Sequence, residues 1–207
     1  MNRKFAALAV AAVATLAPAG VAHADDAPAG ADAFVWPPAE STHGQWLPVP
    51  AAYYEGTSDI EACGTTVAYG FGDVRALQYK AAFRHDGTEV VSYRGRATSD
   101  LVRASDGATL DEVPNDGPGV ETYSPDGLVQ TFTYTGPAVF PAFDAVERAA
   151  FQRAGLPTLA IYRAGVLSER IRVSADPDAT TDVSAKILLN RTVGLVDGCR
   201  LLDRARH

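Results

Sequence analysis

The sequence predicts an all-β fold, mainly antiparallel, built as a sandwich or half-open barrel of about 8–10 short strands with one short helix near 144–154. Three observations lead to this prediction. Apolar and polar residues alternate over several segments. Two cysteines lie far apart, as expected of a disulfide that joins distant parts of a domain. Asp-Gly pairs favour tight hairpin turns, and they recur at 86–87, 106–107, 116–117, 126–127 and 197–198.

Residues 1–24 have the three parts of a secretory signal peptide. Arg3 and Lys4 give a charged start, an apolar run extends from Phe5 to Ala17, and the small residues around His23 form a cleavage motif. A membrane span needs about 20 apolar residues, so this run is too short to be one. We therefore expect cleavage after Ala24, a secreted, extracellular protein, and no integral membrane segment in the mature chain.

The chain is acidic, with 18 Lys and Arg against 25 Asp and Glu and a formal net charge of −7. Removing the two basic residues of the leader leaves 16 against 25, a net charge of −9. Nucleic acids and anionic lipid surfaces bind clustered Lys and Arg. The composition therefore disfavours both as partners. The length of the chain suits one folded domain.

Residues 25–57 predict an extended arm that is rich in Ala and Pro. Its prolines forbid a helix and disfavour a central strand. The arm also carries four candidate binding residues, which have two interpretations. They pack on the domain itself, as large aromatic side chains usually do, or they form a surface that stacks on a sugar or contacts a partner. The four are Trp36, Trp46, Tyr53 and Tyr54.

Residues 58–207 predict a single β-rich domain. Apolar residues occupy every second position in 65–71, 75–83 and 128–135, which is typical of strands that bury one face. Further strands are expected at 88–96, 98–104, 108–113, 119–124, 158–163, 166–173, 185–193 and 195–202.

One helix is expected within residues 142–157. Asp144 is placed as its N-cap, and Glu147 follows three residues later at capping-box spacing. Gly155 is suited to end the helix, with Pro157 beyond it. The apolar side chains of this segment are small and share one face, so we expect the helix to pack on a sheet or over a barrel mouth.

Cys63 and Cys199 predict a disulfide. In an exported protein two lone cysteines usually pair. A metal site would need three or four ligands at close spacing, and a cysteine nucleophile would need a neighbouring base. A free or catalytic thiol remains the alternative. Because bonded cysteines have Cα atoms within about 7 Å, the segments around residues 63 and 199 are expected to be neighbours or to face one another.

Motif searches assign no catalytic residue and no cofactor. The chain has no phosphate-binding Gly-x-x-x-x-Gly-Lys, no dinucleotide fingerprint and no Gly-x-Ser-x-Gly, so we expect no nucleotide ligand. Asp176, Asp178 and Asp182 are candidate calcium ligands in an acidic loop. The twelfth position of an EF-hand would be Ile187 where a Glu is needed, so a solvated turn is the competing interpretation.

The Ala-rich mature start, the segment "AGLPTLAIYRAGVLSERIRV" and the ending "DGCRLL" resemble small secreted β-rich proteins of actinobacteria. The resemblance covers most of residues 58–203. It implies an exported β-rich domain with no assigned activity, and it carries over no catalytic residue.

Two classes of function agree with these observations. One is a non-catalytic binding or envelope-associated module whose partner is a small molecule, a glycan or a protein. The other is an extracellular hydrolase that uses paired carboxylates, for example Asp111 or Glu112 with a distant acid, because such pairs need no sequence motif.

Overall fold

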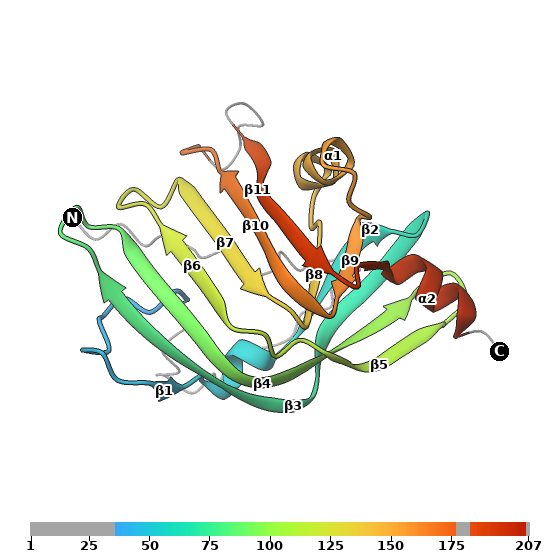
Figure 1. The fold of residues 1–207 in the computed structure, drawn as a ribbon, viewed down its shortest axis with the longest axis horizontal. Coiled ribbons are helices and arrows are strands. Elements are labelled where there is room, and N and C mark those ends of the chain that lie inside the picture. Colours follow the sequence, from blue (N-terminus) through green and yellow to red (C-terminus); the bar gives the residue numbers. More distant parts are fainter. Residues whose placement is uncertain (1–35, 177–182, 206–207) are drawn as a thin grey trace, which may run out of the picture.

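The computed structural model describes residues 36–176 and 183–205. Antiparallel strands dominate this part of the chain (Figure 1). The strands are β1 (Leu47–Pro48), β2 (Thr57–Ala62), β3 (Thr65–Phe83), β4 (Glu89–Arg103), β5 (Thr109–Pro114), β6 (Gly119–Tyr123), β7 (Val129–Thr135), β8 (Ala138–Pro141), β9 (Leu159–Tyr162), β10 (Ala164–Arg172), β11 (Ser184–Val193) and β12 (Val196–Asp197). The helices are the 3₁₀ helix η1 (Ala51–Tyr54), α1 (Ala145–Arg153) and α2 (Gly198–Arg204).

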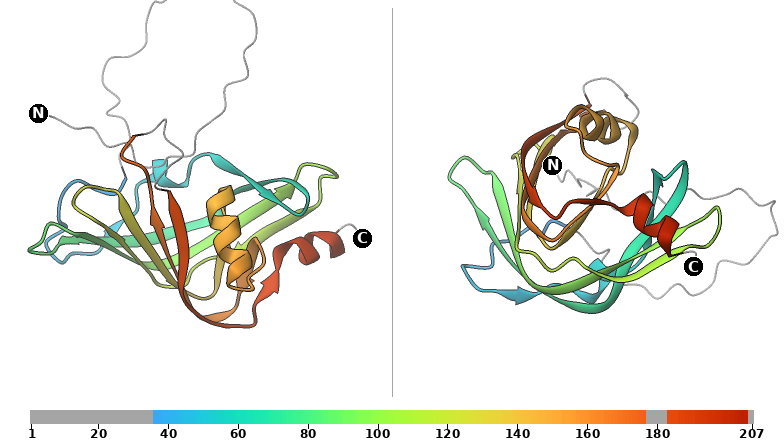
Figure 2. Two further views of the ribbon diagram at one scale, coloured as in Figure 1. Left: turned by 90° about the horizontal axis from the view of Figure 1, so that it is seen from above. Right: turned by 45° about the vertical axis from the view of Figure 1, so that its right-hand side comes forward.

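The described strands form two sheets. The larger has the order β1-β3-β4-β6-β7-β10-β11, with β2 also paired to β3 and β5 to β4, and the smaller has the order β12-β9-β8. The large sheet is strongly curved, and α1 and the small sheet lie on its concave side (Figure 2). The sheets do not close into a barrel. The predicted all-β fold is therefore confirmed, and of the two alternatives the arrangement agrees with the sandwich.

We call the concave face of the large sheet the inner face and the opposite one the outer face. Paired residues of neighbouring strands point to the same side. The register Val91–Glu121–Phe132–Glu169–Ile187 therefore runs across the inner face from β4 to β11. Three clusters of buried apolar side chains fill the inner face: one under the arm, one under α1, and one near α2.

Two strands are longer than predicted. β3 spans 19 residues and β4 spans 15, where we expected each to be divided. The register between them shifts between Phe71 and Arg75 and then resumes, so this irregularity bends the pair without ending it. Long strands that bend in this way account for the curvature of the sheet.

The predicted helix is confirmed as α1. The Asp144 carboxylate accepts the Glu147 N–H at 2.8 Å, and the Glu147 carboxylate accepts the Phe143 N–H at 2.7 Å, which completes the capping arrangement. Phe151 lies on the buried face of this helix and packs in the cluster that contains Leu167 of the inner face. Helix α1 therefore covers the β10 end of the sheet.

The prediction of a strand over 195–202 is wrong beyond Asp197, because α2 begins at Gly198. The Asp197 side chain accepts the Cys199 N–H at 2.9 Å, so this Asp-Gly pair starts a helix instead of making a hairpin turn. The prediction also missed β2. Its turn to β3 consists of Cys63 and Gly64, both with positive φ, and the sequence rule looks for Asn or Asp at the first position.

The predicted disulfide is confirmed. Cys63 and Cys199 are bonded with a Cα–Cα distance of 5.1 Å and a sequence separation of 136 residues. The bond joins the β2–β3 turn to the first turn of α2, and an ion pair of Arg103 with Asp203 at 2.6 Å holds the same helix to β4. No helix within residues 36–176 and 183–205 is long and apolar enough to cross a membrane.

Candidate functional site

The four aromatic residues of the arm do not form one surface. Trp36 and Tyr53 pack together on the inner face, with ring centroids 4.9 Å apart. Tyr54 is buried in the same cluster, and its hydroxyl oxygen accepts the Leu77 N–H at 2.9 Å. Trp46 lies beside the outer face instead, against Lys80 and Arg94.

Three tyrosines surround one buried carboxylate on the inner face, and we call this group the Glu121 cluster. Glu121 is only 4% exposed. The hydroxyls of Tyr93 and Tyr123 donate to its Oε2 at 2.7 and 2.5 Å, and that of Tyr134 donates to its Oε1. The indole N–H of Trp36 in turn donates to the Tyr93 hydroxyl at 2.8 Å. The arm is thus hydrogen-bonded to the cluster.

Strand alternation and one glycine build this cluster. Glu121 and Tyr123 are two residues apart on β6, so both point inward, and Tyr93 and Tyr134 come from the flanking strands. Gly119 lies opposite both of these tyrosines, and a Cβ on it would lie 2.5 Å from the Tyr134 ring. The absence of a side chain at this position lets the ring lie over the strand. The sequence shows the tyrosines and Gly119, but not that they converge on Glu121.

The Glu121 carboxylate is saturated by its neighbours. Burial raises the pKa of Glu121, and the hydrogen bonds from the three phenols act in the opposite direction. Both carboxylate oxygens are occupied by donors, so a ligand would have to displace a tyrosine to reach them. The arrangement is suited to hold the sheet and the arm together, not to bind a substrate.

A second group of buried acids lies between α1 and β10. Glu169 is 1% exposed, and its Oε1 has no hydrogen-bond partner. Burial, together with the neighbouring carboxylates of Glu147 and Asp144 on the α1 side, raises the pKa of Glu169 to about 8. Burial likewise raises the pKa of Glu147 to about 7. At the other end of the inner face, burial and the neighbouring Glu121 raise the pKa of Glu89 to about 7.

These carboxyl groups have one property of a general acid, a pKa near neutrality. They are, however, almost completely enclosed: Glu89, Glu147 and Glu169 are 9%, 6% and 1% exposed. No sequence signal identified them, because Glu occurs at inward strand positions without any local motif.

Asp111 and Glu112, either of which the sequence offered as a hydrolytic acid together with a distant one, both lie on β5 and not among the buried acids of the inner face. Glu112 accepts the Asp73 N–H at 2.6 Å and the Thr98 hydroxyl at 2.6 Å. These hydrogen bonds lower the pKa of Glu112, so it is an anion near neutral pH and a poor proton donor. Asp111 is exposed on the same strand. Glu112 thus ties β5 to the bend of β3.

The calcium candidates fall mostly outside the described residues. Asp178 and Asp182 lie in 177–182, and Asp176 is the last described residue before that segment. Among the residues that the structure describes, no group of three or more His, Cys, Asp or Glu side chains is arranged to hold a metal ion.

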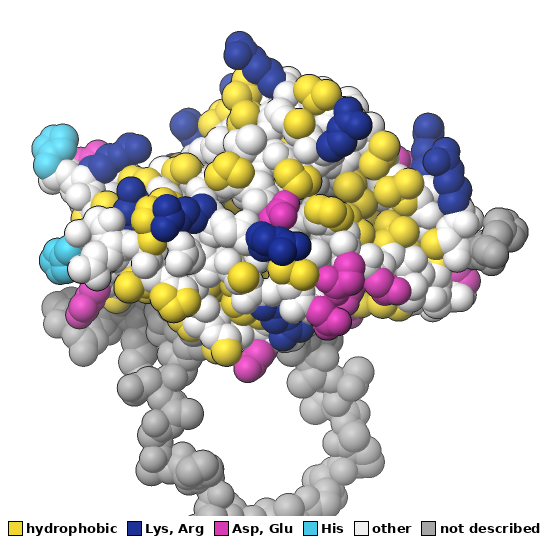
Figure 3. Space-filling model, turned by 60° about the horizontal axis from the view of Figure 1, so that its bottom comes forward, with side chains coloured by type: hydrophobic (Ala, Val, Ile, Leu, Met, Phe, Trp, Pro, Cys, Tyr) yellow, Lys and Arg dark blue, Asp and Glu magenta, His cyan; other side chains and the backbone are white. Residues whose placement is uncertain are grey.

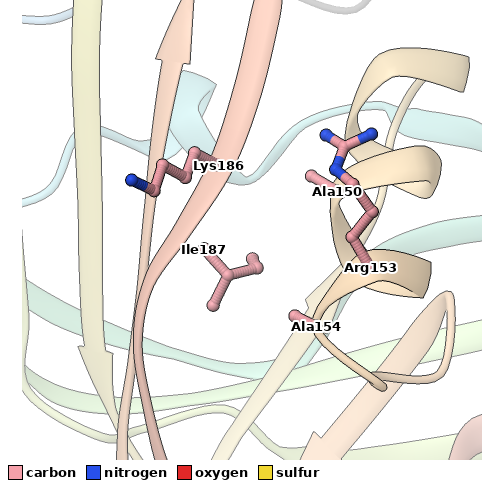
Figure 4. A pocket seen from close by; sticks show the side chains of 5 residues that line it. All are labelled: Ala150, Arg153, Ala154, Lys186 and Ile187. Atoms are coloured by element: carbon pink, nitrogen blue, oxygen red, sulfur yellow. The ribbon is translucent and has the colours of Figure 1, made fainter.

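The surface of the described part of the chain includes two hollows near these elements. One, of about 250 Å³, lies between α1 and β11, and Figure 4 shows Ile187 pointing toward the helix while Lys186 projects from the other side of the strand. The other, of about 550 Å³, is lined by residues that include Tyr54, Arg75 and Asp100. Neither contains the buried carboxyl groups among its lining residues.

Fold and site together define a disulfide-bonded, antiparallel β protein whose inner face holds buried carboxyl groups. A disulfide of this kind is typical of an oxidising compartment. No protein-family model, curated protein or solved structure matches the chain.

Proposed function

We propose that this protein is an exported, non-catalytic binding module associated with the cell envelope, and that it contacts its partner through its outer surface. Export is supported by the signal-like leader of residues 1–24 and by the Cys63–Cys199 disulfide. A binding or envelope-associated role agrees with the absence of catalytic motifs from the sequence and with the disulfide-bonded build. The observation that carries the proposal is the burial of the acids of the inner face, which separates them from a substrate.

The acids of the inner face are buried away from a ligand. The arm covers one end through Trp36, helix α1 covers the other through Phe151, and the Glu121 carboxylate between them is saturated by phenols. Catalytic residues normally line a concave pocket that buries the substrate. The acids with raised pKa values, Glu89, Glu147 and Glu169, are here part of the packed interior. We therefore assign binding to the outer surface.

The hydrolase hypothesis retains one specific observation. Glu169 has a free Oε1 and a pKa of about 8, which are properties of a general acid awaiting a substrate. It would require α1 to move away from the sheet. We therefore keep Glu169 and Glu147 as the residues to test for this alternative.

Two parallel measurements on the mature protein test the proposal. Intact-mass analysis of the exported chain is expected to show a start at Asp25. The purified protein is then mixed with isolated actinobacterial cell walls and, separately, with chromogenic esterase, glycosidase and peptidase substrates. We expect sedimentation with the walls and no turnover. Turnover that disappears in Glu169→Gln or Glu147→Gln would replace the proposal with the hydrolase, and a soluble, inactive protein would refute envelope association.

A further inference from the structure

Six basic side chains project from the outer face in two groups. Lys80, Arg94 and Arg96 come from β3 and β4 at one side, and Arg170, Arg172 and Lys186 come from β10 and β11 at the other. Strand register places them on the same side: Lys80 lies in the row that passes through Ser92, Val120, Thr133 and Ser168, and Arg170 lies two residues along from that row.

Acidic side chains are absent from this part of the face. Between the two basic groups, no described outward position of β6, β7, β10 or β11 is Asp or Glu, because Glu121 and Glu169 point inward. The outward acids of the sheet lie at its opposite end, where Asp100 and Glu112 are joined by a hydrogen bond of 2.8 Å. Figure 3 shows Lys and Arg spread over this side of the molecule and a group of acids gathered toward one end.

Among the described residues none of the six cations is in a close ion pair, although the Asp126 carboxylate in the β6–β7 turn interacts electrostatically with Arg172. Within residues 36–176 and 183–205, the ion pairs closer than 4.0 Å all involve Arg103, which lies elsewhere. Arg94 and Lys80 instead lie over the Trp46 ring, at 4.3 and 5.1 Å from its centre, and Arg94 also donates to Gln78. The ring orients the two side chains and leaves their charge available to an anion.

Hydroxyl groups occupy the strip between the basic groups. Thr131 and Thr133 of β7 and Thr122 of β6 face outward there, and Thr133 is hydrogen-bonded to Ser168 at 2.7 Å. Three strand spacings separate β4 from β10 in the sheet order, a distance of about 14 Å. The face therefore presents two cationic edges, and the uncharged strip between them carries hydroxyl groups together with the exposed side chain of Val120.

We propose that the outer face binds a linear anionic glycan of the cell envelope that crosses the sheet from one basic group to the other. This inference rests on the proposed function, whose partner it names. Charge complementarity selects an anionic partner, since a chain of net charge −7 places six cations on strands whose outward positions between them hold no Asp or Glu. The guanidinium groups match carboxylate or phosphate substituents, and the threonine hydroxyls match sugar hydroxyls.

The shape of the face favours a flexible polymer over a membrane. A curved and twisted sheet touches a planar bilayer along a narrow strip, so the two basic groups would not engage it together. A glycan chain can follow the twist and contact both. Anionic vesicles and single-stranded DNA therefore serve as competing ligands in the test.

The test measures binding of the full mature chain to polygalacturonate, with neutral dextran as the uncharged polymer. We expect saturable binding to polygalacturonate alone. If about five charges are neutralised, the affinity falls about 100-fold between 50 and 200 mM salt. The triple variants K80Q/R94Q/R96Q and R170Q/R172Q/K186Q are each expected to lose at least tenfold in affinity. Thermal unfolding of each variant shows whether it is folded.

A matched control removes three cations from the helices instead: R148Q/R200Q/R204Q has the same net charge as either variant. It is expected to bind like the wild type. Equal loss in this control would show a non-specific charge effect and overturn the proposal, as would the absence of binding. Equal or tighter binding to phosphatidylglycerol vesicles or to DNA would assign the face to that partner. If cell walls bind the protein but polygalacturonate does not, the glycan inference fails and the proposed function stands.

Discussion

The two faces of the large sheet differ in their ionisable side chains, with an acid inside and a base outside on neighbouring residues of β10. Glu169 and Arg170 are consecutive on β10, yet Glu169 is 1% exposed under α1 and Arg170 is exposed on the outer face. Acids on the inner face lie in a poorly hydrated interior, where they are held by phenols or kept neutral by a raised pKa. Cations on the outer face stay hydrated and charged.

The difference shows that net charge is a poor guide to the partners of a sheet protein. The overall charge of −7 made an anionic partner look unfavourable. Strand alternation, however, places Glu89 and Glu121 inside, and the outward acids Asp100 and Glu112 lie at the other end of the outer face. The net charge of the whole chain therefore does not indicate the basic groups on the outer face. Binding to nucleic acid or anionic lipid remains disfavoured as a prediction, and the comparison of ligands tests it.

Breaking the disulfide should produce the largest loss of stability. Reducing the Cys63–Cys199 disulfide releases a loop of 136 residues, and the chain-entropy treatment gives a loss of roughly 5 kcal/mol in the free energy of unfolding at most. We expect the fold to survive at moderate temperature, since the Arg103–Asp203 ion pair and the core still hold α2. Denaturant unfolding with and without reductant measures the difference.

The cysteine variants provide the control for this prediction. Cys63→Ser and Cys199→Ser should each match the reduced protein, and the double variant should be little worse than either, because the two residues act as one unit. Additive losses would show that the thiols contribute separately and would contradict the disulfide account.

Removing the acceptor of the Glu121 cluster should have the next largest effect. Glu121→Leu leaves buried phenol hydroxyls without their partner, at about 1–3 kcal/mol for each unsatisfied group, so we expect a loss of about 3 kcal/mol in stability. Thr122→Leu changes the adjacent, outward residue and is expected to shift stability by no more than about 0.5 kcal/mol. Similar losses for both variants would show that the two faces do not differ in packing.

The sequence predicts which residues share a face of this sheet better than it predicts which strands and side chains are in contact. Alternation correctly placed residues of β3 and β7, and Asp-Gly marked the β3–β4, β4–β5 and β6–β7 turns. The same pair at 116–117 lies instead in the connection from β5 to β6, and at 197–198 it caps α2. Turn residues describe local backbone preferences, whereas the pairing around them decides whether a hairpin or a helix forms.

The candidate sites were less predictable for the same reason. Trp36 and Trp46 are ten residues apart in one arm, and only the pairing of β1 with β3 decides that they lie on opposite faces. Glu121 has no local motif, and its role depends on tyrosines from two other strands. The outer basic groups likewise come from strands that are neighbours only in the folded sheet.

Raising the pH should lower the free energy of unfolding, because it ionises the buried acids of the inner face. The pKa values of Glu89 and Glu147 are raised to about 7 and that of Glu169 to about 8, against about 4.5 in the unfolded chain. The folded protein therefore binds more protons than the unfolded chain between about pH 4.5 and 8. Its free energy of unfolding should fall as the pH rises through this window, at about 1.4 kcal/mol for each pKa unit by which a group is raised. Denaturant titrations at pH 5, 6, 7 and 8 measure this slope, and a rise in stability would contradict it.

Substitutions on the outer face should have the smallest effect on stability. The adjacent residues Glu169 and Arg170, one on each face, allow the inner and outer faces to be compared directly. Arg170→Gln removes a hydrated, unpaired charge, so stability should change by less than about 0.5 kcal/mol while affinity for polygalacturonate falls. Glu169→Gln should leave that affinity unchanged and flatten the slope of stability against pH, because a neutral amide cannot release the proton that burial retains. Each variant is the control for the other. If Glu169→Gln weakens polymer binding as much as Arg170→Gln does, the two faces are coupled and the division between a structural interior and a binding exterior fails.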